Sequence, residues 1–384
     1  MDKNSILIII TAISLIISLI LALFLFTVKT SNKPSNLLFA IFLLVTAIDI
    51  SEPIFNEIIH SPSNLRMFRN TFSFLQIPVF YVYLLSVCYS DFKLKIRHLL
   101  HFIPFLISNL ILFSRFYSVS VISKINFLKN HLNMIEIQFN HILIHIQFII
   151  YFIAIFIILK KSKKLYLENY AGTNINSYKW LFQFTIVLTF LYLIALFKNI
   201  FKFSEYSNIS EWIKIGLLIF QLCIICWYLF NALNNPNLFR NIDSKLKLVS
   251  DIVLEVRNNN QVMTIEREFN TTLLKLQHYM IEKKPFLNPS ITIQNISDDI
   301  EIPVRDLSLL INNKLGQHFF DFINTYRIEN AMIILKDSNK KEETVLEILY
   351  EVGFNSKSSF NTAFKKHTGT TPTSYRKQLY NKKL

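Results

Sequence analysis

The chain has 384 residues, of which only 5 are Gly, and 52% of its residues are hydrophobic. Proteins contain about 7% Gly on average, so this shortage argues against Gly-rich phosphate loops and all-β folds with many tight turns. Residues 1–233 carry 19 Lys and Arg against 9 Asp and Glu, whereas residues 234–384 carry 21 against 17. We therefore expect an all-α chain with an apolar, membrane-spanning first part and a soluble second part.

Seven stretches of the apolar part are candidates to cross a bilayer, which takes about 20 residues as a helix. A membrane interior forces each span to satisfy its own backbone hydrogen bonds, so these stretches predict a polytopic bundle of transmembrane helices. The expected spans are Ser5–Val28, Ser35–Ile50, Asn70–Tyr89, Leu99–Ser114, Phe139–Leu159, Trp180–Phe197 and Glu211–Leu233.

The Lys and Arg residues of the loops predict how the bundle is oriented. The loops that share a side with the C-terminus hold 10 Lys and Arg in short segments, among them Lys160–Lys179, and the opposite side holds 8 in longer segments. This bias places the C-terminus in the cytoplasm and the protein in the cytoplasmic (inner) membrane. On the outer side, the long loop Phe116–Gln138 would either help to form a ligand pocket or simply connect two spans.

Some polar residues in the spans leave two interpretations open. His141 and His145 share a helix face, which would suit a metal pair, although a polar contact within the bundle is the simpler interpretation. Asp49 would face either a ligand cavity or the lipid headgroups. Cys223 and Cys226 lie inside an apolar helix, where Cys behaves as a small hydrophobe. The sequence predicts no catalytic residue, no cofactor and no metal site.

Residues 236–284 are expected to couple the membrane domain, residues 1–235, to a DNA-binding domain in residues 285–384. Apolar residues at heptad spacing predict a short coiled coil there, and with it a possible homodimer. They are Ile242, Leu246, Val249, Val253 and Val256. Only about two heptads are present, so an amphipathic helix that packs on its own chain or on the membrane is an equal alternative. A second amphipathic stretch, Met263–Glu282, follows.

A first helix-turn-helix unit is predicted after residue 285. Thr292 is suited to cap a helix that ends at Ile300. Pro303 fits the first turn of a second helix, which is expected to stop at Gly316. A helix, a short turn and a second helix form the geometry that places the second helix in a DNA major groove.

The same pattern returns about 50 residues later, after a longer central helix. Caps at Thr344 and Ser356 and stops at Gly353 and Gly369 bound two helices, Val345–Val352 and Lys357–Thr368. Two recognition helices held ~34 Å apart, about one DNA turn, would read successive major grooves. Residues 352–384 hold seven Lys and Arg and no Asp or Glu, a basic surface suited to phosphate contact.

Several spaced motifs in this region match those of a known family. They are Gly353-Phe354-Asn355-Ser356-Lys357-Ser358-Ser359-Phe360, Phe364-Lys365-Lys366, Gly369, Thr371-Pro372, Tyr375-Arg376 and, in the central helix, Asp321-Phe322-Ile323-Asn324-Thr325-Tyr326-Arg327. Residues 285–380 resemble the C-terminal domain of AraC/XylS-type transcription regulators. The resemblance covers about the last quarter of the chain and implies a seven-helix domain with two helix-turn-helix units that binds promoter DNA.

The chain departs from this family at two positions. The family often places Arg in each recognition helix, where this chain has Leu309 and Thr362, so the usual Arg contacts to guanine are missing. The candidate base readers are Arg305, Ser308, Asn312, Lys357, Ser358, Asn361 and Thr362. The candidate phosphate contacts are Lys365, Lys366 and Arg376, and the structural turn residues are Gly316, Gly353 and Gly369.

The leading hypothesis is a membrane-bound, sequence-specific transcription regulator. A ligand of unknown identity at the transmembrane bundle would change the binding of the cytoplasmic domain to double-stranded promoter DNA. The alternative is a transporter or channel-like membrane protein with a regulatory cytoplasmic tail. An enzyme is the least favoured class, because the chain has no Ser/His/Asp, metal-ligand or phosphate-loop pattern.

Overall fold

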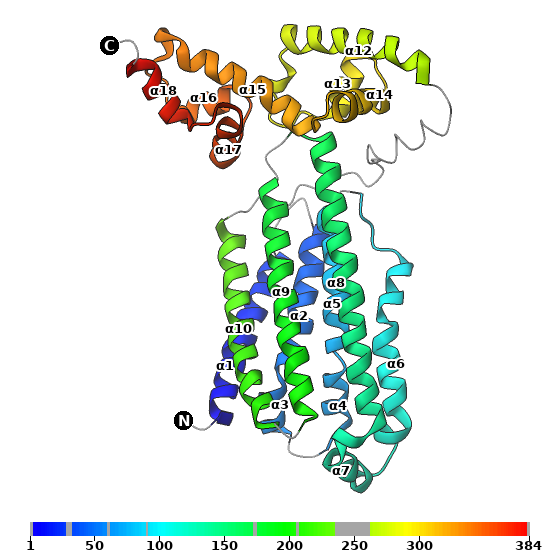
Figure 1. The fold of residues 1–384 in the computed structure, drawn as a ribbon. Helices are drawn as coiled ribbons and strands as arrows, with labels where there is room; N and C mark the ends of the chain where they lie inside the picture. Colours follow the sequence, from blue (N-terminus) through cyan, green and yellow to red (C-terminus); the bar gives the residue numbers. More distant parts are fainter. Residues whose placement is uncertain are drawn as a thin grey trace. The chain divides into compact units, whose positions relative to one another are not determined.

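A computed structural model of the chain describes residues 3–27, 33–59, 62–89, 91–171, 175–204, 207–234 and 262–381 (Figure 1). All the regular elements in these ranges are helices, so the predicted all-α class is confirmed. The chain divides into two compact units, residues 1–159 with 179–244 and residues 160–178 with 245–384. The heptad residues between Ile242 and Val256 lie outside the described ranges.

The first unit is a bundle of long helices, drawn in blue to green in Figure 1. Its α-helices are α1 (Lys3–Thr27), α2 (Lys33–Ile50), α3 (Glu52–Ile58), α4 (Asn64–Asn70), α5 (Ser73–Cys88), α6 (Ile103–Leu112), α7 (Val121–Lys129), α8 (Ile135–Asn169), α9 (Ile175–Lys202) and α10 (Ser207–Asn234). Short 3-10 or π segments are η1 (Ile96–Phe102), η2 (Phe113–Tyr117) and η3 (His131–Asn133). The last residues of α8 and the first of α9 belong to the second unit.

Six helical stretches in the described ranges are long and apolar enough to cross a membrane. They are Asn4–Thr27, Asn64–Cys88, Ile96–Tyr117, Ile135–Asn169, Tyr178–Lys202 and Asn208–Tyr228. A bent pair, Pro34–Ile50 and Glu52–Ile58, makes a seventh if its two parts form one span, although its axes differ by 51°. These stretches overlap the seven predicted spans, so the apolar helical part of the fold prediction is confirmed.

The bounds of two predicted segments were wrong. The predicted span Phe139–Leu159 lies within α8, which continues to Asn169, so the first half of the predicted loop Lys160–Lys179 is helical. The Lys residues in this first half are too polar for the apolar interior of a membrane. Lys nevertheless has a high helix propensity, so the helix continues through them. The predicted outer loop Phe116–Gln138 also contains a helix, α7, which Ser120 caps by accepting a hydrogen bond from the amide of Ser123.

Aromatic side chains form the centre of the bundle, where α2, α5, α9 and α10 meet. The ring of Phe39 stacks on Tyr228 with centroids 4.0 Å apart and lies 4.8 Å from the ring of Tyr83. On the outside, many large apolar side chains are exposed, such as Ile16, Leu23 and Ile150. An outward apolar surface of this extent is unusual for a soluble protein.

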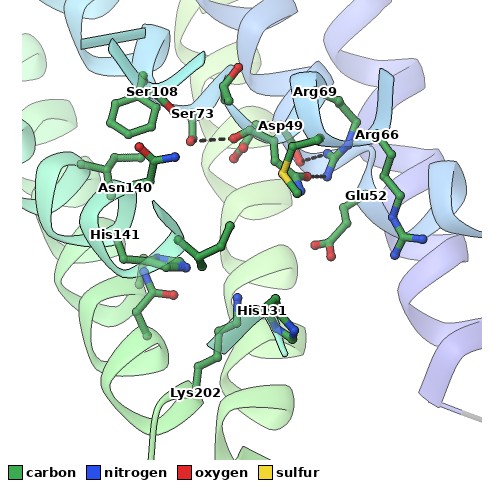
Figure 2. Close-up of a pocket in the computed structure, with 18 of the residues that line it drawn as sticks. Asp49, Glu52, Arg66, Arg69, Ser73, Ser108, His131, Asn140, His141 and Lys202 are labelled. Carbon is green, nitrogen blue, oxygen red and sulfur yellow. Dashed lines mark hydrogen bonds between the residues drawn. The ribbon is translucent and has the colours of Figure 1, made fainter. Parts of the chain in front are cut away.

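One end of the bundle encloses a cavity of about 730 Å³ (Figure 2). Residues from the C-terminal ends of α2 and α9 and from the N-terminal parts of α8 and α10 are among those that line it. Asp49 is one of its lining residues, and so are several residues of the loop Phe116–Gln138. His141 and His145 line it too, and Nε2 of His145 lies 3.0 Å from Nδ2 of Asn199. His145 therefore makes the polar contact that was the simpler interpretation.

The second unit holds the C-terminal helices, drawn in yellow to red in Figure 1. They are α12 (Val262–Glu282), α13 (Ile293–Ile300), α14 (Val304–Ser308), α15 (Phe319–Lys336), α16 (Val345–Glu351), α17 (Lys357–Thr368) and α18 (Pro372–Asn381). Short segments η4 (Pro285–Leu287), η5 (Leu309–Lys314) and η6 (Ser338–Lys340) lie between them. Six of these α-helices, α13–α18, follow residue 285, where the family resemblance begins, and α12 lies in the predicted coupler.

Two hydrophobic cores stabilise this unit, and α15 contributes to both. The first half of α15, with Phe319, packs against α12, α13, α14 and η5. Its second half, with Leu335, packs against α16 and α17. Leu276 and Met280 of α12 are buried in the first core, so the helix that the sequence analysis assigned to a coupler is part of this domain's packing.

Candidate DNA-binding site

The first helix-turn-helix unit consists of α13 and the helical stretch α14–η5. The hydroxyl of Thr292 accepts a hydrogen bond from the amide of Asn295, and Oδ1 of Asn295 accepts one from the amide of Thr292. This capping box satisfies two amides that would otherwise lack partners at the start of α13. Glu301 then turns the chain in the left-handed conformation, with φ at +53°, within the short turn predicted at Glu301 and Ile302.

The second helix of this unit changes its pitch along its length. It begins as α14 at Val304, with Pro303 as its N-cap, and widens at Leu309 into a π-helical segment that ends at Lys314. The chain then reverses at Gly316, which has a φ of +64°. Widened turns of this kind often occur at functional sites, and this one lies in the stretch that was predicted to read bases.

The three candidate base readers of this stretch differ in exposure. Arg305 is exposed, Ser308 is buried and Asn312 is half-buried. Nδ2 of Asn312 donates hydrogen bonds to the carbonyl and the hydroxyl oxygens of Ser308, both at 3.2 Å, and its Oδ1 accepts one from the amide of Phe319 at 3.0 Å. In this conformation Asn312 connects Ser308 with the start of α15, and the base-reading role of both residues stays a prediction.

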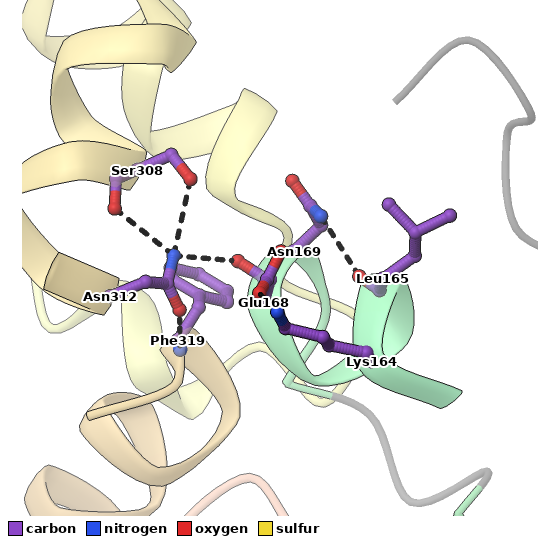
Figure 3. A network of polar contacts seen from close by, with 7 residues as sticks. All are labelled: Lys164, Leu165, Glu168, Asn169, Ser308, Asn312 and Phe319. Carbon is purple, nitrogen blue, oxygen red and sulfur yellow. Dashed lines mark hydrogen bonds and ion pairs between the residues drawn. The ribbon is translucent and has the colours of Figure 1, made fainter. Parts of the chain in front are cut away.

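The C-terminal end of α8 joins this unit through Asn312 (Figure 3). Nδ2 of Asn312 also donates to the carbonyl oxygen of Glu168 at 3.2 Å. Two residues beyond the end of α8, the amide of Ala171 donates to the carbonyl of Ile291 at 3.2 Å, and the side chain of Ala171 is buried in the first core. This segment therefore covers the side of the recognition stretch on which Asn312 lies.

Sequence reasoning missed the docking of this segment. Four of the five buried residues between Lys160 and Asn169 lie at the i, i+3, i+4 and i+7 positions of one helix face, but only two of the four are apolar. The four are Ser162, Leu165, Tyr166 and Asn169. The four neighbouring Lys residues favoured a loop interpretation and hid this pattern.

Arg327 on α15 connects this segment with both cores. Its side chain is fully buried, and its guanidinium donates to the carbonyl oxygens of Phe286 at 2.7 Å, Ala171 at 2.8 Å and Asn288 at 2.8 Å. Its Cζ also lies 5.4 Å from the ring centroid of Phe354 in the second core. Burial lowers the pKa of Arg327 to about 10, so the group stays charged at neutral pH. In the sequence Arg327 stands out only as part of the family motif, and no local pattern predicts this role.

The second helix-turn-helix unit consists of α16 and α17. A capping box between Thr344 and Glu347 starts α16, and the amide of Thr344 lowers the pKa of the Glu347 carboxyl by donating to it. Ser356 caps α17, which ends at Gly369 with a φ of +78°. Phe360 and Phe364 of α17 are fully buried, and their packing fixes which face of the helix points outward.

The outward face of α17 holds the candidate base readers of the second unit. Lys357, Ser358 and Thr362 are exposed, and Asn361 is half-buried. The hydroxyl of Thr362 donates to the carbonyl of Ser358 within the helix at 2.8 Å. Unlike Asn312, these side chains bond to no other segment in the described part of the chain.

The three candidate phosphate contacts also differ in their surroundings. Lys365 is exposed. Nζ of Lys366 lies 2.7 Å from Oδ1 of Asp321, an ion pair that water screens. Arg376 is half-buried and donates to the carbonyl of Glu343 at 2.6 Å. Lys365 is therefore the one of the three whose side chain is both exposed and outside any contact among the described residues.

The described ranges hold no group of three or more His, Cys, Asp or Glu side chains that could bind a metal ion. The exposed functional groups of the two helix-turn-helix units are instead cations and hydrogen-bonding side chains on α14 and α17. Residues 296–378 match the family model described as a helix-turn-helix domain. The C-terminal domain of this chain is an AraC-type helix-turn-helix domain.

Two relatives match the chain over about a quarter of its length or less. An HTH-type transcriptional regulator of Staphylococcus aureus (strain COL) is 34% identical over 86 residues, which are 22% of this chain and 11% of the relative. The transcriptional regulatory protein YesN of Bacillus subtilis (strain 168) is 30% identical over 93 residues, 24% of this chain and 25% of that protein. The chain thus spans a quarter or less of these relatives. No solved structure matches the chain.

Proposed function

We propose that this protein is a membrane-bound transcription regulator, whose AraC-type domain binds promoter DNA in the cytoplasm and whose helical bundle receives a signal. The observation that carries the proposal is the pair of helix-turn-helix units, each of which packs against the same helix, α15. The second of these units presents Lys357, Ser358 and Thr362 on the exposed face of α17. Such a helix face contacts base edges and phosphates in a major groove.

The apolar surface of the bundle supports the membrane part of the proposal. Its outward Ile, Leu and Phe side chains are exposed to a degree that water disfavours and lipid accepts. The excess of Lys and Arg in the loops on the side of the C-terminus supports a cytoplasmic position for the DNA-binding domain. Dimerisation through the heptad residues near Val249 is part of the same proposal.

DNA binding by the full-length chain in lipid nanodiscs tests the proposal. Chromatin immunoprecipitation of the chain in its own host would supply genomic fragments, and gel retardation would then measure their affinity. We expect specific fragments to bind at least 1,000-fold more tightly than unrelated DNA, the lower end of the usual specificity ratio of about 10³–10⁷. The substitution Ser358→Glu should abolish retardation, because a carboxylate on the outward face of α17 repels phosphates.

The same substitution at Ser338 is the matched control. Ser338 is exposed in η6, outside both helix-turn-helix units. Ser338→Glu should bind the fragments as tightly as the unmodified chain. If the unmodified chain enriches no genomic fragment, or if both substitutions weaken retardation equally, promoter binding through α17 is wrong.

A further inference from the structure

The cavity of the bundle has the size and lining of a site for a small organic molecule. Its volume of about 730 Å³ lies within the range of about 300–1,000 Å³ of ligand pockets in proteins. Apolar side chains such as Leu112, Phe116 and Phe148 form part of its wall. Polar and charged side chains form the remainder, and Figure 2 shows Glu52, His141 and Lys202 pointing into the same space from different helices.

Positive charge dominates the polar part of the lining. It contains two carboxylates, Asp49 and Glu52, against six basic side chains, Arg66, Arg69, Lys129, Lys198, Lys202 and Lys214. With neutral His residues, four positive charges are left over. A ligand that enters this space meets a field that attracts anions, and the partly apolar surroundings strengthen that field.

Two of the basic side chains have partners within the protein. Nζ of Lys214 lies 3.1 Å from Oε2 of Glu52. Arg69 donates to the carbonyl oxygens of Ile48 at 3.1 Å and Asp49 at 2.8 Å. Lys198 and Lys202, by contrast, have no carboxylate within 4 Å in the described ranges. The ammonium groups on the last turns of α9 therefore remain for a ligand.

Buried polar atoms on other helices also lack a partner. Nε of Arg69 and Oγ of Ser108 are buried, make no hydrogen bond within the described part of the chain, and belong to residues that line the cavity. Arg69 itself is only 6% exposed. Both atoms can donate, and buried donors without acceptors are costly. An acidic group in the cavity would supply acceptors for such donors.

We propose that the cavity binds an amphiphilic anion, a molecule with one acidic head group and an apolar body. The head group pairs with Lys198 and Lys202, and the apolar body packs against the wall formed by residues such as Phe116 and Phe148. The inference deepens the proposed function, because it names the class of signal that the bundle receives. In the proposed orientation, this end of the bundle faces away from the cytoplasm.

Three probes of equal chain length test the charge preference. Decanoate, decanol and decyltrimethylammonium would be titrated by calorimetry into the full-length chain in phosphatidylcholine nanodiscs, with empty nanodiscs subtracted. We expect decanoate to bind at least tenfold more tightly than the neutral and the cationic probe, because charge-assisted hydrogen bonds are the stronger ones. Equal affinities for the three probes, or no binding of decanoate, would overturn the proposal.

Substitutions at the two ammonium groups test the site itself. The double variant Lys198→Gln with Lys202→Gln should weaken decanoate binding at least tenfold. The conservative variant Lys198→Arg should retain it, since the charge remains, and this variant also shows that the position tolerates change. The matched control Lys93→Gln, at an exposed site outside the cavity, should bind like the unmodified chain. Unchanged binding in the double variant would overturn the proposal.

The acidic group could belong to a membrane lipid or to a free molecule, and two further titrations distinguish these sources. Phosphatidylglycerol in the nanodisc would compete with decanoate if a lipid headgroup is the ligand, whereas it would leave decanoate binding unchanged if a free anion is the ligand. Retardation of promoter DNA by the same samples separates this inference from the proposed function. If the chain shows no preference for decanoate but still binds promoter DNA, only the anion site is rejected. If it prefers decanoate but binds no promoter DNA, only the proposed regulator function is rejected.

Discussion

Gly353 stands at the reversal between α16 and α17 in a conformation that L-residues with a side chain avoid. Its φ is +88°, and a Cβ added there would lie 2.5 Å from the carbonyl oxygen of Phe286 and 2.7 Å from that of Leu287. Gly369 also has a positive φ, of +78°, but a Cβ there would meet no atom within 4 Å. An Ala at Gly369 would therefore lose stability only through the backbone conformation, whereas an Ala at Gly353 would also lose stability through steric overlap.

Ala substitutions at these two positions should therefore destabilise the domain by different amounts. The left-handed conformation costs about 1–2 kcal/mol at either position. At Gly353, overlap with the backbone of Phe286 and Leu287 adds about 1–3 kcal/mol. Hydrogen exchange of the amides of α15 in the full-length chain would measure the loss, because the best protected amides report the free energy of unfolding. Equal losses for Gly353→Ala and Gly369→Ala would contradict the crowding at Gly353.

At the scale of single elements, α17 differs from α14–η5 in what holds its polar side chains. Phe360 and Phe364 fix α17 to the second core and leave Lys357, Ser358 and Lys365 exposed. On α14–η5, Asn312 bonds to Ser308, to Phe319 and to the end of α8. The polar face of α17 is thus exposed, whereas α14–η5 is covered on the side of Asn312.

We expect Lys365 on α17 to contribute one phosphate contact. Because each neutralised phosphate adds about 0.9 to the slope of log K against log salt, Lys365→Gln should reduce that slope by about 1 and weaken all DNA sequences alike. The matched control is Lys336→Gln, at an exposed position on the last turn of α15 outside both recognition helices. Retardation at several salt concentrations checks both, and an unchanged slope for Lys365→Gln would remove Lys365 from the contacts.

At the scale of the whole molecule, α8 and α9 are the described helices with residues in both units, and α8 has the larger share in the second unit. The first half of α8 supplies Asn140, His141 and His145 to the cavity of the bundle. Its last turn supplies the carbonyl of Glu168 to Asn312 in the first helix-turn-helix unit. A ligand that binds two conformations of the cavity with different affinities shifts their populations, and we propose that α8 carries this change to Asn312.

Two Gly residues inserted between Leu159 and Lys160 test this route, because Gly makes a helix interior flexible. In the unmodified chain we expect decanoate to change DNA affinity at least threefold. The insertion should leave decanoate binding and DNA binding in place and remove the link between them. The same insertion between Lys93 and Leu94, in the connection after α5, is the control and should keep the response.

Retardation with and without decanoate, on nanodisc samples of all three chains, would measure the effect. A full response in the chain with the insertion at Leu159 would show that the signal travels by another route, such as α10 and the segment before α12. A lost response in the chain with the insertion at Lys93 would show that the insertions act through general disruption of the bundle.

Features that depend on neighbouring residues could be predicted from the sequence. The cap at Thr292, the stops at Gly316 and Gly369 and the apolar spans each follow from a local pattern, because helix starts, left-handed turns and membrane-length runs are decided within a few turns of chain. The outward position of Ser358 followed in the same way from the spacing of buried Phe residues on α17.

Only the tertiary structure decided which segments complete the first helix-turn-helix unit. The bond from Asn312 to Glu168 joins residues 144 positions apart, and the bond from Arg327 to Ala171 joins residues 156 positions apart. No local pattern encodes such contacts, because their partners are chosen by the packing of the whole unit. The sequence by itself determined the helical class, the apolar stretches long enough to cross a membrane and the AraC-type helix-turn-helix domain. The fold decided that the end of α8 belongs to that domain. Buried polar side chains need hydrogen-bond partners, and the packing of the unit places the carbonyls of Glu168 and Ala171 beside Asn312 and Arg327.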